Sequence, residues 1–335
     1  MPQSYFLSII IPAYNAGETI ERCIKSCIQK TTYPYEIVIV NDGSGDNTEE
    51  IIKRFADNYE NICLINQENR GVAAARNTGL RSSQADLIMF VDADDELLDG
   101  ALQTVYEDYQ HHKPDLLSYY FNNDRINGVT DLHFLSENFY SSHVDKQWLI
   151  KKIFFNGEKI ALSGPYCRLY CKEIIEKNHI EFNESLRLGE DRVFNNDYIC
   201  HIDSFEYIDK CIYTRHVVPD SITHKFSVDG LNNHLVYFNE IKIQSEELRN
   251  VGIDNDNECR LRIVLDSYAA LKSSVYLNNK LEKSDKIKTA KKFISEEVIS
   301  DAVKGLRYRY GFKTNVKIFL LKRKWVRIIP LFFRS

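Results

Sequence analysis

The chain lacks the features of a membrane-spanning or secreted protein. No apolar run reaches the roughly 20 residues needed to cross a bilayer, and residues 1–11 contain neither a basic stretch nor a long apolar segment. We therefore expect no signal peptide and no membrane-spanning helix. The eight cysteines are scattered, and several fall on apolar helical faces, which is typical of reduced, buried thiols in a cytoplasmic protein.

Two common site motifs are also missing. Cys167 and Cys171 are spaced like a metal-binding pair, but no second pair at ligand spacing accompanies them, so we expect no zinc site. No Gly-x-Gly-x-x-Gly follows the first predicted strand, which argues against a dinucleotide-dependent dehydrogenase. The 335 residues have 44% apolar content, which is enough for one large domain and a smaller one.

Acidic residues are absent from the end of the chain. Residues 303–335 contain ten lysines and arginines and no aspartate or glutamate, whereas residues 1–302 contain 33 basic and 48 acidic residues, a net charge of −15. Because most of the chain is acidic, we expect no nucleic-acid partner. The basic tail also carries bulky apolar residues, which suits peripheral contact with the anionic inner face of the cell membrane. A packed helix whose charges face water explains the same composition, so both interpretations stay open.

Strand and helix patterns alternate through the first hundred residues. Continuous apolar runs predict buried strands at residues 8–11, 37–40, 62–65 and 86–91. Apolar residues at helical spacing predict helices between them, at residues 20–28, 46–56 and 72–81. This order, with right-handed crossovers, gives an α/β fold in which a mostly parallel sheet is flanked by helices.

Polar loops follow each predicted strand, at residues 12–15, 41–44, 69–71 and 92–94. Ligands of open parallel sheets bind beyond the carboxyl ends of the strands, so these loops should converge on one cleft. Four polar loops on one rim are typical of a nucleotide site.

Three carboxylates crowd the last of these loops. Asp92, Asp94 and Asp95 follow directly on an apolar strand and should repel one another unless a cation lies among them. Oxygen ligands suit Mg²⁺ or Mn²⁺, which can in turn hold a phosphate-bearing substrate. Acidic turns also follow strands simply as solvated helix caps, but Asp99 already serves as the cap of the next predicted helix.

Four motifs occur in order at the predicted strand ends: residues 10–15 (IIPAYN), 40–44 (VNDGS), 69–77 (NRGVAAARN) and 92–94 (DAD). Together they resemble the signature of family-2 glycosyltransferases, which have the Rossmann-like GT-A fold, and the resemblance covers roughly the first 220 residues. It implies a nucleotide-sugar donor, most often a UDP-sugar, and transfer with inversion at the anomeric carbon. It also implies a divalent metal, Mn²⁺ or Mg²⁺, and a glycan or lipid-linked saccharide acceptor of the kind used for bacterial surface polysaccharides.

The resemblance assigns the nucleotide to nine residues, which are Pro12, Ala13, Tyr14, Asn15, Asp42, Arg76, Asp92, Ala93 and Arg215. Pro12, Tyr14 and Asn15 line the base and ribose, Asp42 hydrogen-bonds the uracil, and Arg215 holds a diphosphate oxygen. Arg76 faces the nucleotide from the third helix. A turn residue beside a glycine and a solvated helical arginine explain Asp42 and Arg76 without a ligand.

The metal is assigned by the same resemblance to the Asp92–Asp94 pair. Asp94 binds the ion that bridges the two phosphates, and Asp92 contacts the ribose or reaches the ion through water. His216 completes the metal shell, with His224 competing for that role. The position of Asp95 in this scheme is the least defined of the three.

The acceptor hydroxyl must lose a proton as it attacks, which requires a nearby base. Glu190 and Asp191 resemble the Glu-Asp motif of the family, and the resemblance makes Asp191 the general base. Acidic residues are also favoured at a helix start by the helix dipole, which explains both carboxylates without catalysis. Residues 164–170 lack the tryptophan that such enzymes often place in the acceptor wall, so that wall stays unassigned.

These assignments divide the chain. We expect a catalytic domain at residues 1–226, with a nucleotide-binding half (1–115) and an acceptor half (116–226), and a helical C-terminal region at residues 227–335. The sequence indicates no oligomeric state. Two rival functions stay open. One is an Asp-x-Asp phosphatase, although the motif does not follow the first strand and position 96 is glutamate. The other is a non-catalytic nucleotide- or sugar-binding module.

Overall fold

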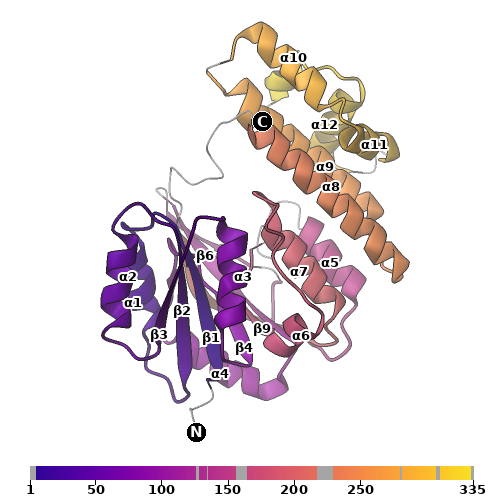
Figure 1. Cartoon of the computed structure of the whole chain (residues 1–335). Helices are drawn as coiled ribbons and strands as arrows, with labels where there is room; N and C mark the ends of the chain where they lie inside the picture. The colour runs from indigo at the N-terminus through magenta and orange to yellow at the C-terminus, as the bar shows by residue number, and fades with distance from the viewer. Residues whose placement is uncertain are drawn as a thin grey trace. The chain divides into compact units, whose positions relative to one another are not determined.

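The structure is a computed structural model that describes residues 5–125, 128–133, 135–155, 164–216, 229–279, 281–306 and 310–332. These residues form two compact units, which are treated separately below (Figure 1). The first unit draws on residues 1–149, 156–185 and 190–218, and the second on residues 150–155, 186–189 and 219–335. The expected boundary at 226/227 lies outside the described residues.

The first unit begins with the predicted alternation of strands and helices. Its elements are β1 (Leu7–Ala13), α1 (Ile20–Cys27), β2 (Tyr35–Asp42), α2 (Thr48–Ala56), β3 (Ile62–Gln67), α3 (Val72–Ser82) and β4 (Leu87–Phe90). β1 pairs in parallel with β2 and β4, and β2 pairs in parallel with β3. Every residue of β1 and β2 is buried, as expected for parallel strands covered on both faces. The predicted α/β fold is confirmed.

The second half of this unit extends the sheet with strands that run in both directions. It contains β5 (Glu96–Leu97), α4 (Ala101–His112), β6 (Leu116–Arg125), β7 (Gly128–Leu132), β8 (Phe139–Ser141), the first residues of α5 (Lys146–Phe155), β9 (Arg168–Cys171), α6 (Lys172–Lys177), α7 (Glu190–Cys200) and β10 (Phe205–His216). The strand order is β3-β2-β1-β4-β9-β6-β10-β5, with β7 on β6 and β8 on β10. β9 runs antiparallel to both β4 and β6, so the sheet is mixed. The pairing of β10 with β5 brings the end of β10 to the loop that follows β4.

The second unit is helical, which confirms the predicted helical C-terminal region. It contains α8 (Asp229–Asn250), α9 (Asp256–Ala270), the π-helix η2 (Leu271–Tyr276), α10 (Lys283–Phe293), α11 (Glu297–Gly305), α12 (Phe312–Lys322) and the 3-10 helix η3 (Ile329–Phe332). Its core includes Phe238, Val264 and Ile299, each with no exposed surface. Within the described parts of the chain, no helix is both long and apolar enough to cross a membrane.

Helix α3 lies unusually close to the sheet because a glycine faces it. α3 packs against β1 and β2 (Figure 1). A Cβ atom at Gly79 would lie 2.3 Å from Cγ2 of Ile10, a fully buried side chain of β1. A larger residue at position 79 must therefore push α3 away from the sheet that positions the site.

We predict that Gly79→Ala lowers the free energy of unfolding by about 1–3 kcal/mol, because the added methyl overpacks the interface between α3 and β1. Urea denaturation followed by circular dichroism measures the change. Gly45→Ala is the control, since a Cβ there meets only Asn15 Oδ1, at 4.0 Å. Equal midpoints for the two variants would contradict this packing.

Candidate active site

Hydrogen bonds to Asp42 join the second polar loop (residues 41–44) to the third (residues 69–71). Its Oδ1 accepts hydrogen bonds from the Gln67 side chain (2.7 Å) and the Arg70 backbone N–H (2.9 Å), and its Oδ2 accepts one from the Gly71 N–H (2.8 Å). Asp42 is buried, so these bonds satisfy most of a carboxylate withdrawn from water. The side chain expected to bind the uracil therefore also holds the loop that precedes α3.

The loop after β1 is tied to the loop after β2. The Asn15 N–H donates to Ser44 Oγ (3.0 Å), and the Gly45 N–H donates back to Asn15 Oδ1 (2.8 Å). Gly43 has φ +68°, and a Cβ there would lie 2.7 Å from the Asn69 nitrogen, so a side chain would force the loop after β2 away from the loop after β3. Pro12 and Ala13 end β1 in buried positions, whereas Tyr14 is 49% exposed. A planar aromatic face is thus available on the rim.

The carboxylates that follow β4, Asp92, Asp94 and Asp95, lie close enough to repel one another. Burial, followed by the charge of Asp92, raises the pKa of Asp94 above its ordinary value. Burial and the charges of Asp92 and Asp94 raise the pKa of Asp95 to about 8. Ala93, between them, is buried, so the Asp92–Asp94 pair is held by the local backbone. Hard oxygen donors in a negative field are what a divalent cation requires.

Asp95 has a structural task that the sequence analysis did not identify. Its Oδ2 accepts a hydrogen bond from the Tyr213 hydroxyl (2.7 Å), and its Oδ1 accepts one from the His216 backbone N–H (2.9 Å). The same hydroxyl accepts a hydrogen bond from the Asp92 N–H (3.1 Å). Asp95 therefore fastens the end of β10 to the loop after β4. The sequence analysis gave Tyr213 no role.

The end of β10 brings Arg215 and His216 to this cluster. Burial lowers the pKa of Arg215, but Tyr166, Asp95 and the neighbouring carboxylates raise it, and the net shift is upward. The Arg215 guanidinium therefore lies in the negative electrostatic field of this carboxylate cluster. His216 Nε2 is 2.6 Å from Glu96 Oε2, and its Nδ1 is 3.4 Å from Asp124 Oδ2. Both ring nitrogens thus face carboxylates.

No preformed cage of three or more histidine, cysteine, aspartate or glutamate side chains is found among the residues that the structure describes. His224, the competing metal ligand, lies outside them.

Arg76 connects the carboxylate cluster to α7. It is only 5% exposed, and its Nη2 lies 2.9 Å from Asp92 Oδ1 while its Nη1 lies 3.1 Å from Glu190 Oε1. The guanidinium carbon lies 5.3 Å from the centre of the Phe182 ring, and Phe182 stacks on Phe194 of α7. The residue expected to face the nucleotide therefore bridges two of the other predicted site residues.

Asp191 is the second residue of α7, beside the Arg76 bridge. Burial and the adjacent Glu190 raise its pKa to about 7, although Arg192 and Arg76 oppose the shift. The Arg192 N–H donates to Asp191 Oδ1 (2.7 Å). A helix N-terminus alone lowers the pKa of a carboxylate, so the raised value means that burial outweighs the dipole. A carboxylate with a pKa near neutrality is suited to accept a proton.

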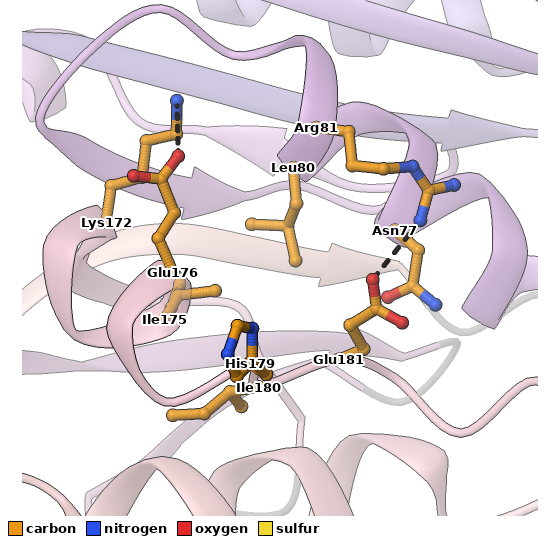
Figure 2. A pocket seen from close by; sticks show the side chains of 9 residues that line it. All are labelled: Asn77, Leu80, Arg81, Lys172, Ile175, Glu176, His179, Ile180 and Glu181. Atoms are coloured by element: carbon orange, nitrogen blue, oxygen red, sulfur yellow. Dashed lines mark hydrogen bonds and ion pairs between the residues drawn. The ribbon is translucent and has the colours of Figure 1, made fainter.

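A separate hollow of about 450 Å³ lies between α3 and α6 (Figure 2). Ion pairs between Lys172 and Glu176 (3.2 Å) and between Arg81 and Glu181 (3.4 Å) lie along its walls. Its lining consists of Asn77, Leu80, Arg81, Lys172, Ile175, Glu176, His179, Ile180 and Glu181. The predicted nucleotide, metal and base residues do not line it, so it is not the candidate active site.

Comparison with known proteins agrees with this arrangement. The family model described as "Glycosyl transferase family 2" matches residues 8–178. Glycosyltransferase GlyA of Streptococcus pneumoniae is 29% identical over 65% of this chain, which spans 31% of GlyA. The uncharacterized glycosyltransferase YibD of Escherichia coli is 30% identical over 73% of this chain and 71% of its own length.

A solved structure shows the same fold. The crystal structure of Staphylococcus aureus TarS residues 1–349 in complex with UDP-GlcNAc has a TM-score of 0.69 and 19% identity, covering 98% of this chain and 91% of that chain. The predicted GT-A architecture is therefore confirmed. Since the family model also matches more than half of the sequence, the chain belongs to glycosyltransferase family 2.

Proposed function

We propose that this chain transfers a sugar from a UDP-sugar to a hydroxyl of a glycan or lipid-linked acceptor, with inversion at the anomeric carbon and a divalent cation. The observation that carries the proposal is Arg76, which links the aspartates after β4 to the carboxylates that begin α7. This Arg76 bridge supports the proposal that the leaving-group site and the catalytic base belong to one active site. TarS, whose fold this chain shares, has been crystallised with UDP-GlcNAc and with UDP.

The donor nucleotide is assigned to the linked loops after β1 and β2. The exposed ring of Tyr14 is suited to stack on a base, and Pro12, Ala13 and Asn15 form the adjacent backbone. A carboxylate can accept about four hydrogen bonds, so Asp42 retains capacity for the uracil beyond the three it already accepts. This assigns nucleotide binding to residues 1–115 and leaves the acceptor to residues 116–226.

The cation is assigned to Asp94, with Asp92 as a nucleotide or outer-sphere contact. The raised pKa values of Asp94 and Asp95 support a cation site, because a positive ion would relieve the repulsion among these carboxylates. Their oxygen donors suit Mn²⁺ or Mg²⁺. When bound, the ion would neutralise charge that develops on the departing diphosphate. Arg215, in the same field, is assigned to a diphosphate oxygen. For His216 to coordinate the ion, one of its ring nitrogens must first break its contact with Glu96 or Asp124.

The proton transfer is assigned to Asp191. As the acceptor oxygen bonds to the anomeric carbon, its proton passes to the Asp191 carboxylate, and the electron pair of the breaking sugar–phosphate bond leaves with UDP. Glu190 pairs with Arg76 and contributes to the raised pKa of Asp191. Family membership disfavours the phosphatase alternative, and a non-catalytic module requires no base at this position.

Two relatives suggest the kind of acceptor. This chain is 27% identical to the minor teichoic acid biosynthesis protein GgaB of Bacillus subtilis and 27% identical to the poly(ribitol-phosphate) beta-glucosyltransferase of Bacillus spizizenii. The matches cover 26% and 29% of those proteins. We infer a cell-surface glycan acceptor, reached from the cytoplasmic side.

We predict that Asp191→Asn lowers the rate of sugar transfer by about 10²–10⁴-fold, because the amide cannot accept the acceptor proton. UDP affinity, measured by calorimetry, should stay near the wild-type value. Asp197→Asn, on the same helix, is the matched control and should retain transfer. Unchanged transfer by Asp191→Asn would favour the non-catalytic alternative.

We also predict that UDP binding depends on a divalent ion and on Asp94. Calorimetry with UDP and Mn²⁺ should give a measurable heat of binding that EDTA abolishes. Asp94→Asn should lower the affinity for UDP by at least about tenfold, since a metal ligand and a charge are lost. Asp99→Asn, an exposed carboxylate close by, is the control. Equal UDP affinity with Mn²⁺ and with EDTA would sink the metal assignment.

A further inference from the structure

We propose that the C-terminal helical unit docks on the surface of an anionic phospholipid bilayer through a patch at its basic end. This inference goes beyond the proposed transfer reaction and does not depend on the donor site. The tail patch, as we call it, consists of Phe312, Lys313, Phe319, Lys322, Trp325 and Arg327.

The patch begins with one face of α12. Phe312, Val316, Phe319 and Arg323 are spaced by four, three and four residues, so they share that face of the helix. Phe312 is 83% exposed and Phe319 is 37% exposed, whereas Ile318 on another face is fully buried. α12 is therefore held to its unit by one side and leaves an aromatic side exposed to water.

Cations flank this aromatic face. Lys313 and Lys322, both exposed, fall about 100° and 80° to either side of it by helical periodicity. Arg323 lies on the face itself, 5.9 Å from the centre of the Phe319 ring. An apolar strip bordered by lysines on both sides is the arrangement of a helix that lies in the plane of a membrane interface.

The end of α12 holds a tryptophan in the same surface. Lys324 has φ +53°, and the N–H groups of Lys324 and Trp325 donate to the carbonyls of Leu321 (3.0 Å) and Leu320 (3.0 Å). These two bonds form a Schellman cap, which reverses the chain. The reversal places the Trp325 ring 5.3 Å from Phe319, edge to face, with Trp325 still 47% exposed. Tryptophan and phenylalanine at one surface suit the headgroup level of a bilayer.

A basic hollow adjoins the tryptophan. It has a volume of about 300 Å³ and is lined by Lys291, Lys324, Trp325, Val326, Arg327 and Ile328. Three cations and no acidic side chain line it, which fits the phosphate of a lipid headgroup. The Tyr276 hydroxyl donates to the Val326 carbonyl (2.6 Å), so this wall is anchored to η2.

Charge distinguishes a membrane from the other kinds of partner that a basic, aromatic surface can bind. Residues 303–335 contain no aspartate or glutamate, so a second copy of the chain docked symmetrically here would oppose cations to cations. An acidic polymer would satisfy the cations but would leave the exposed rings in water. An anionic bilayer satisfies both, because it offers negative headgroups above an apolar layer.

Vesicle co-sedimentation of the full chain tests the proposal. Wild-type protein should bind phosphatidylglycerol-containing vesicles, bind pure phosphatidylcholine vesicles far less, and be released by high salt. Replacing both Lys313 and Lys322 by alanine should weaken binding by about twenty-fivefold, since each cation contributes about fivefold. Phe312→Ser combined with Trp325→Ser should also weaken binding by about tenfold or more through lost apolar burial.

Lys53→Ala and Tyr59→Ser, an exposed lysine and an exposed tyrosine of the first unit, are the matched controls and should bind like wild type. Circular dichroism checks that all variants remain folded. Three results would overturn the proposal: equal binding to neutral and anionic vesicles, no binding to either, or equal losses in the patch and control variants. Dimerisation that the Phe312/Trp325 variant abolishes, without vesicle binding, would assign the patch to a second copy instead.

Discussion

The active centre depends on one buried cation. Arg76 is almost fully buried, and its guanidinium contacts Asp92 at one end and Glu190 at the other. Without it, these carboxylates would face each other in a site of low polarity, and removing one partner of such a buried group typically destabilises a protein by about 3–5 kcal/mol. The bridge therefore explains how acidic residues from distant parts of the sequence can share one site. The same side chain therefore contacts both the proposed donor site, at Asp92, and the helix that carries the proposed base.

Other polar groups fix the geometry around this bridge. Asp95 joins Tyr213 and the His216 backbone, which holds the end of β10 beside the loop after β4 and keeps Arg215 in reach of the cluster. Asp42 holds the loop before α3, the helix that carries Arg76. The carboxylate oxygens of both aspartates accept hydrogen bonds mainly from protein donors. The rim of the sheet is thus organised by buried carboxylates whose first task is structural.

Much of the first half of the fold could be predicted from sequence, because buried parallel strands appear as continuous apolar runs and the helices between them repeat at 3.6 residues. The predicted strand at residues 37–40 lies within β2 (Tyr35–Asp42), for example. The strands β6 to β9 were not predicted, since short antiparallel strands in an aromatic-rich segment give no clear period. Their pairing is set by contacts between distant residues, such as Leu116 with Tyr170.

The candidate residues were predictable as a set, but their contacts were not. Motif order indicated Arg76 and Glu190, yet no spacing rule could reveal that these two side chains meet across 114 positions. Sequence patterns assigned no role to Asp95 and Tyr213, because their structural role is a hydrogen bond between the loop after β4 and strand β10, which no such pattern reveals. The exposed aromatic face of α12 was likewise hidden, since composition shows cations and apolar residues but not which side of a helix packs.

The pH dependence of kcat/KM in wild type, Arg76→Met and Arg76→Lys tests the central claim most directly. Asp191 accepts a proton only as a carboxylate, and its pKa is raised to about 7, so wild-type kcat/KM should rise through that pH and then level off. Arg76 lowers the pKa of Asp191, so Arg76→Met should move the rise to higher pH while Arg76→Lys stays nearer wild type. A wild-type profile without a rise near pH 7, or an unchanged midpoint in folded Arg76→Met, would contradict the account.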